Sequence, residues 1–165
     1  YIAKQVSTEI ADVVANTPSA GKVALYILMD DGTIAKQETK SAVLAACSED
    51  SKRPLTDSVE VRDPQTVAYD IAFTYYIPSE STSSSTDIET AVDAAVKEYV
   101  SWQCGKLGRD INPSKLIGLL MQTGIKRVAL TSPDFTALKD GSDNAVPQVA
   151  AVGEITATNG GHEDE

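Results

Sequence analysis

The sequence predicts an α+β fold: a split βαβ (ferredoxin-like) sheet with helices on one face, plus an extra short helix and flanking strands. Residues 67–77 alternate apolar and polar side chains, which is typical of a half-buried strand. Residues 86–104 repeat apolar side chains at helical spacing. Along the chain the patterns read strand, helix, strand, strand, helix, helix, strand, which is close to the split βαβ order.

These patterns divide the 165-residue chain into three parts. We expect an N-terminal extended segment or strand over residues 1–22, an α+β core domain over 23–132, and a C-terminal loop, strand and acidic tail over 133–165. A chain of this length buries enough surface to fold without a metal or a disulfide. It begins with Tyr1 and not with methionine, so we expect a missing N-terminal part.

The first elements follow from local patterns. Residues 1–20 are expected to be extended and to turn at 17–21, and the apolar run 23–29 predicts a strand buried on both faces. Residues 35–50 predict a helix and 58–62 a strand. The helix is expected to turn four residues toward the core: Val43, Leu44, Ala46 and Cys47.

In the second half of the chain, local patterns also predict helices and strands. After the strand 67–77 and a serine-rich loop, Thr86 and Glu89 have the spacing of a capping box for the long helix. Asn112 can cap the next helix, and Gly124 can end it. That helix is apolar around much of its girth, which predicts that it is sandwiched: Leu116, Ile117, Leu119, Leu120 and Met121. Strands are predicted at 126–131 and 152–158, before a mobile tail.

Charge and composition exclude several functions. The net charge of −10 repels phosphate and argues against a nucleic-acid partner. No apolar run approaches the roughly 18 residues of a membrane span. Cys47 and Cys104 lie in helical patterns, where buried free thiols are expected and a disulfide between the two helices is the alternative.

The residues of catalytic and metal sites do not come together in this sequence. The single histidine, His162, lies in the acidic tail, where a metal ligand would lack fixed geometry. Two Gly-Lys pairs lack the first glycine of a phosphate-binding loop, because Asn16 and Val100 stand there. We therefore predict no catalytic, cofactor-binding or metal residues, no small-molecule substrate, and a protein that is not an enzyme.

Five residues are candidates for contacts with other proteins: Trp102, Arg109, Asp110, Arg53 and Asp57. Trp102 could instead pack against the sheet. Arg109 and Asp110 could contact a partner, or could form an ion pair that fixes the turn between the two helices.

The run LGRDINPSKLIGLLMQTGIKRVALTSPDF, over residues 107–135, resembles the C-terminal portion of the baseplate J-like family. The resemblance extends to GKVALYIL, KRPLTDSVEVRDPQTVAYDIAFTYYI, AAVKEYVSWQCGKLGRDI and EITATNGGHEDE. It implies a structural wedge subunit of a contractile phage or prophage tail baseplate, with other wedge proteins and neighbouring copies as partners. It also implies location in the virion after assembly in the bacterial host cytoplasm.

A different class of function stays open beside this one. A ferredoxin-like sheet could form a small-ligand-binding regulatory module, which would need a cleft with convergent polar groups. A thermal-shift screen against amino acids and nucleotides separates the two hypotheses.

Overall fold

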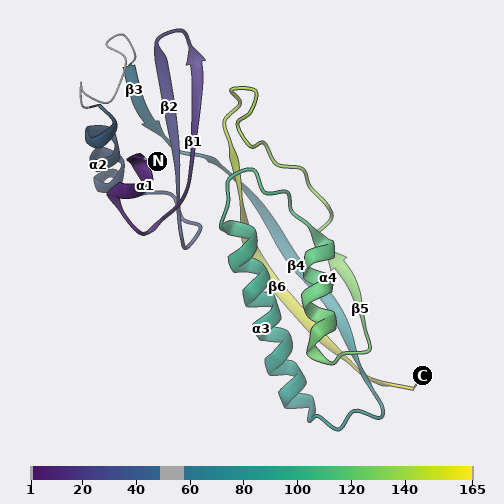
Figure 1. Cartoon of the computed structure of the whole chain (residues 1–165). Helices are drawn as coiled ribbons and strands as arrows, with labels where there is room; N and C mark the ends of the chain where they lie inside the picture. Colours follow the sequence, from purple (N-terminus) through teal and green to yellow (C-terminus); the bar gives the residue numbers. More distant parts are fainter. Residues whose placement is uncertain (1, 49–57, 165) are drawn as a thin grey trace. The chain divides into compact units, whose positions relative to one another are not determined.

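The computed structural model describes residues 2–48 and 58–164, which form two compact units. Unit 1 combines Tyr1–Val67, Cys104–Arg109 and Ala137–Ala150, and unit 2 combines Ala68–Gln103, Asp110–Thr136 and Ala151–Glu165. The chain therefore passes between the units several times. Figure 1 gives the order of the elements along the chain.

Unit 1 contains a three-stranded sheet in the order β1-β2-β3. Its strands are β1 (Ile10–Ser19), β2 (Lys22–Met29) and β3 (Ser58–Arg62). β2 pairs antiparallel with β1 and parallel with β3. The helices α1 (Ile2–Val6) and α2 (Gln37–Cys47) belong to the same unit. They contribute Ala3 and Val43 to its core.

Both faces of β2 are buried, as the run 23–29 predicted. One face joins a core with the two helices, and it presents Leu25, Ile27 and Met29. The other face joins a second core with the chain segments that return from unit 2, and it presents Ala24, Tyr26 and Leu28 against Leu107 and Val149. A strand covered on both sides must be apolar at every position.

The returning segments are held to the sheet of unit 1 by polar contacts as well. The backbone N–H of Leu107 donates to Asp12 Oδ2 at 3.2 Å. The side-chain amide of Asn16, which is buried, donates to the carbonyl oxygen of Ala145 at 2.7 Å. Unit 1 thus depends on residues far apart in sequence.

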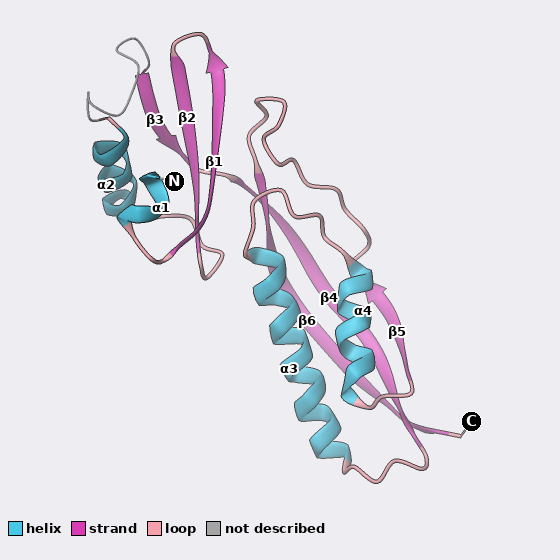
Figure 2. Ribbon diagram, viewed as in Figure 1, coloured by secondary structure: helices cyan, strands magenta, loops and turns pink. Residues whose placement is uncertain are grey.

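Unit 2 contains the second sheet, in the order β5-β4-β6. Its strands are β4 (Gln65–Pro78), β5 (Arg127–Ser132) and β6 (Gln148–Glu163), and its helices are α3 (Ser85–Cys104) and α4 (Pro113–Leu120), followed by the 3₁₀ turn Met121–Thr123. β4 and β5 are antiparallel. Figure 2 shows α3 and α4 on the same face of this sheet.

The alternation in β4 is confirmed. Every second side chain is buried: Tyr69, Ile71, Phe73, Tyr75 and Ile77. The ring of Tyr69 meets the ring of Tyr99, on α3, edge to face at 6.3 Å between centroids. This places the buried side chains of β4 beneath the helices, and the intervening side chains on the opposite, open face.

The α+β class is confirmed, but the strands form two three-stranded sheets and not one split βαβ sheet. The two units also differ from the predicted boundaries of 1–22, 23–132 and 133–165. Periodicity identifies a strand but not its neighbour. Here β2 and β4, the two most apolar strands, are each the centre of a separate sheet.

Helix ends follow the predicted chemistry, with one correction. Asn112 caps α4 by accepting the N–H of Ser114 at 3.0 Å, and Gly124 follows with a φ of 89°. At α3 the capping pair is Ser84 and Asp87, and not Thr86 and Glu89: the N–H of Asp87 donates to Ser84 Oγ at 3.1 Å. The serine-rich run offers several possible caps, so the pattern alone placed this helix start two residues late.

The remaining differences lie at the chain ends and on helix surfaces. Residues 1–20 contain α1 as well as β1, and β6 runs on to Glu163 through most of the predicted tail. Ile117 on α4 is 36% exposed, and Met121, which begins the 3₁₀ turn after it, is 43% exposed, so the described residues do not cover α4 on both sides. Leu44 is also exposed. Cys47 and Cys104 are both half-buried. No helix among the described residues has the length and apolar character to cross a membrane.

Candidate interaction surfaces

Trp102 lies on α3 at the border of the core of unit 2. Its ring is 6.2 Å from that of the fully buried Tyr99, and the ammonium of Lys115, on α4, lies 5.7 Å from its centroid. The indole is half-buried. Trp102 therefore packs within the chain on one side and still presents a surface on the other.

The turn between α3 and α4 is organised by Gln103, which is completely buried. Its side-chain amide donates to the carbonyl oxygen of Asp110 at 3.0 Å, and its carbonyl accepts the N–H of Asn112 at 3.4 Å. A polar side chain in the apolar stripe of the helix was the only sequence signal for this role. It fixes the backbone that carries Asp110.

The other predicted contact residues stand as follows. Arg109 belongs to unit 1 and Asp110 to unit 2, and an ion pair between them stays a prediction. Arg53 and Asp57 lie outside the described residues.

The open face of the second sheet carries a cluster that the sequence did not indicate, made of Tyr76, Arg127, Gly160 and Glu163. The guanidinium carbon of Arg127 lies 3.7 Å from the centroid of Tyr76. The same guanidinium donates to Glu163 through Nε at 2.8 Å and through Nη2 at 2.5 Å. A Cβ at Gly160 would lie 2.5 Å from the Tyr76 ring, so the ring covers this glycine. We call these four residues the Tyr76 cluster.

The Tyr76 cluster ties the three strands of the sheet together at one end. Arg127 begins β5, Tyr76 lies on β4, and Glu163 ends β6. Charge-assisted bidentate hydrogen bonds fix geometry better than a single contact. The hydrogen bonds from Arg127 lower the pKa of the Glu163 carboxyl below its usual value of 4.5, and they raise the pKa of Arg127.

This cluster predicts that acid loosens the end of β6. Because the pKa of Glu163 is lower in the folded state, its contribution is complete above pH 4.5 and is lost as the pH falls through the folded value. The protection factors of the amides of residues 161–163, which compare the observed exchange rate with the intrinsic rate at the same pH, should therefore fall in acid. In Glu163→Gln these amides should have low protection factors at every pH, whereas Glu154→Gln should keep the pH dependence of the wild type. An unchanged profile in Glu163→Gln would show that the pair does not hold the strand.

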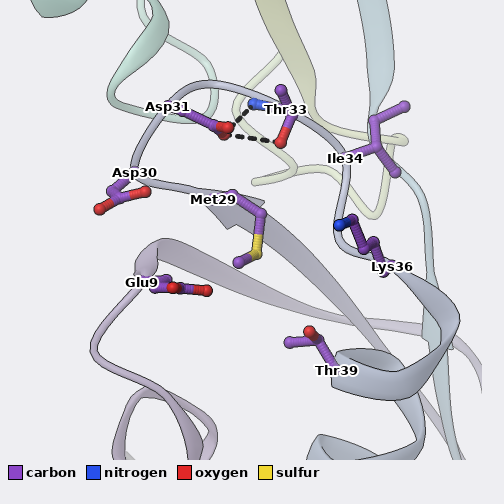
Figure 3. Close-up of a pocket in the computed structure, with 8 residues that line it drawn as sticks. All are labelled: Glu9, Met29, Asp30, Asp31, Thr33, Ile34, Lys36 and Thr39. Atoms are coloured by element: carbon purple, nitrogen blue, oxygen red, sulfur yellow. Dashed lines mark hydrogen bonds between the residues drawn. The ribbon is translucent and has the colours of Figure 1, made fainter.

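A pocket in unit 1 lies beside the end of β2 (Figure 3). Its lining is Glu9, Met29, Asp30, Asp31, Thr33, Ile34, Lys36 and Thr39. Asp31 accepts hydrogen bonds from the backbone N–H and the hydroxyl of Thr33 at 2.9 and 2.6 Å, and these bonds lower its pKa. The carboxylate of Asp31 is thus engaged by Thr33, and these hydrogen bonds close the turn after β2. Among the residues that the structure describes, no group of three or more His, Cys, Asp or Glu side chains could hold a metal ion.

The architecture is that of a two-unit α+β protein, with a separate helix-backed sheet in each unit. Family models match both parts: the Baseplate J-like central domain matches residues 1–63, and the Baseplate J-like protein C-terminal domain matches residues 69–158. The chain belongs to the baseplate J-like family, which confirms the resemblance seen in the sequence. The border between the two matches falls close to the border between the units, at Val67 and Ala68.

One relative and one solved structure extend this result. Baseplate protein J of Escherichia phage P2 is 28% identical over 134 residues, which are 81% of this chain and 43% of that protein. A chain in the cryo-EM structure of the anti-feeding prophage (AFP) baseplate, 6-fold symmetrised, matches with a TM-score of 0.62 and 14% identity. The match covers 91% of this chain and 35% of that one, and it shows a shared fold. The chain thus spans less than half the length of either protein.

Proposed function

We propose that this chain is a structural component of a phage or prophage tail baseplate, a wedge subunit that acts in assembly through protein–protein contacts and not as an enzyme. One observation carries the proposal. Two successive domains of the baseplate J-like family match this chain, in order and over nearly its whole length.

The partners in this proposal are other wedge proteins and neighbouring copies of the same chain, and the location is the tail baseplate of the virion, assembled in the cytoplasm of the bacterial host. The names of the two matched proteins support a baseplate location, since one is a baseplate protein of a phage and the other belongs to a prophage baseplate.

The surface of unit 2 offers residues suited to such contacts. Trp102 presents part of a large ring held by its neighbours, and rigid aromatic side chains often anchor interfaces. Ile117 lies on α4, and Met121 lies four residues further on, at the start of the 3₁₀ turn, so the two exposed side chains lie on the same side of this helical segment. We propose Trp102, Arg109 and Asp110 as contact residues, together with Arg53 and Asp57 from the segment 49–57.

The test is whether the chain binds the proteins encoded by adjacent tail genes. We expect the chain, coexpressed with the products of adjacent tail genes, to elute with at least one of them in size-exclusion chromatography. Trp102→Ala should weaken that complex by about tenfold or more, as for an interface anchor. Lys97→Ala, an exposed change on the same helix, should leave it unchanged. Failure to bind any tail protein would contradict the proposed function.

A further inference from the structure

β6 is an edge strand of unusual length. It runs from Gln148 to Glu163, and β4 is its neighbour on one side in the sheet order β5-β4-β6. Every residue from 153 to 160 is exposed. Within the described residues, the outer edge of this stretch therefore presents a row of backbone N–H and C=O groups without a strand partner.

The stretch 153–160 also lacks the features that normally protect an edge strand. It reads GEITATNG, with no proline, lysine or arginine and with Glu154 as its one charge. Its isoleucine and threonines favour extended backbone. Such an edge suits the addition of another strand.

We propose that the outer edge of β6 pairs antiparallel with β6 of a second copy of this chain, so that two three-stranded sheets become one continuous sheet. This inference rests on the proposed function, in which neighbouring copies touch, and it names the surface that they use.

The sequence of the stretch is compatible with itself in this pairing. In a two-fold antiparallel pair, residues on the same face of the sheet meet, so the axis passes through a residue. With the axis at Thr156, Glu154 faces Thr158 of the second copy; with the axis at Ala157, it faces Gly160. No acid meets another acid in either register. The other acid of the strand, Glu163, is neutralised by Arg127 of its own chain.

Charge distinguishes a second copy from a different partner. A basic partner would be attracted by the net charge of −10, and salt would weaken its binding. Two copies of this chain repel each other at long range, and backbone hydrogen bonds with threonine and alanine pairs would hold them at short range. Salt should therefore strengthen their association.

The test compares two opposite charges at Thr158, an exposed residue. Thr158 shares a face with Glu154, and in either register it lies opposite or diagonal to Glu154 of the second copy. We expect Thr158→Lys to tighten the dimer and Thr158→Glu to loosen it, with dissociation constants about tenfold apart. Ser41→Lys and Ser41→Glu change the net charge equally at an exposed site on α2 and should differ much less.

Sedimentation equilibrium of the whole chain at about 0.05 M and about 0.5 M NaCl gives the dissociation constants of the wild-type and variant dimers. Hydrogen exchange at low and high protein concentration locates the contact. The expected result is a wild-type dimer that is stronger in high salt, with protection appearing in residues 153–160 as the concentration rises.

Three results would overturn the inference: a monomer at every concentration, equal effects of the Thr158 and Ser41 pairs, or protection of β6 only when another tail protein is added. The chain can bind other tail proteins even if β6 does not pair with a second copy. The pairing can therefore fail while the proposed function stands, and the two experiments distinguish these outcomes.

Discussion

Replacing Leu120 by alanine is expected to lower the free energy of unfolding by about 2–5 kcal/mol. Leu120 is 0% exposed, at the end of α4. Removing its branched side chain loses the transfer free energy of the buried carbons and leaves a cavity that the surrounding residues fill only in part. Denaturant melts that follow unit 2, through the fluorescence of Trp102, measure the change.

Pro113→Ala is the matched comparison on the same helix. Pro113 occupies the first turn of α4, where its role is to restrict the unfolded chain, so its loss should cost under about 1 kcal/mol. Equal and small effects of the two substitutions would contradict the packing of α4 against the sheet.

The second large effect is expected at Gly108. Its φ is +69°, and a Cβ there would overlap the backbone of Asp140. Its N–H also donates to the carbonyl oxygen of Gln148 at 2.7 Å, so the segment has little freedom to move away. Backbone strain and overlap together should make Gly108→Ala cost about 2–5 kcal/mol in the stability of unit 1.

Substitutions at two other glycines separate the cost of backbone strain from the cost of steric overlap. Gly124 has a φ of +89°, but no described atom lies within 4 Å of the place that a Cβ would take, so alanine there should cost about 1 kcal/mol from the backbone alone. Gly118 lies within α4 with open space around it among the described residues, so alanine should stabilise the helix by up to about 1 kcal/mol. If Gly108→Ala cost no more than Gly124→Ala, the close approach to Asp140 would not matter for stability.

Local patterns predicted most elements of the fold. The run 23–29 and the alternation in 67–77 were identified because burial on two faces, or on one, leaves a direct mark in the sequence. Asn112 and Gly124 marked the ends of a helix because capping uses few residue types. The pairing of strands leaves no such mark. Thus β2 and β4 were placed in one sheet, although each centres its own.

The surfaces were harder to predict than the core. Trp102 stands out by residue type alone, and the structure shows one side of it packed and part of it exposed. The Tyr76 cluster joins three strands whose order was not predicted, so Arg127 and Glu163 had no visible relation in the sequence. The same holds for the segment that carries Leu107 back into unit 1, because its glycines have the pattern of an ordinary helix end.

The two units suggest how a structural role would follow from this architecture. In unit 1, segments from distant parts of the chain complete a core around β2. In unit 2, α3 and α4 cover one face of the sheet, and residues 153–160 of β6 are exposed. A rigid core with exposed polar strand edges is well suited to protein–protein contacts, which hold an assembly together and need no catalytic residues.

The structural role in the baseplate is tested by deleting the coding sequence of this chain in the cell that produces it and imaging the tails by electron microscopy. We expect tails without a complete baseplate, or no assembled tails, and restoration when the gene is supplied in trans. Complete baseplates in normal numbers after the deletion would contradict it.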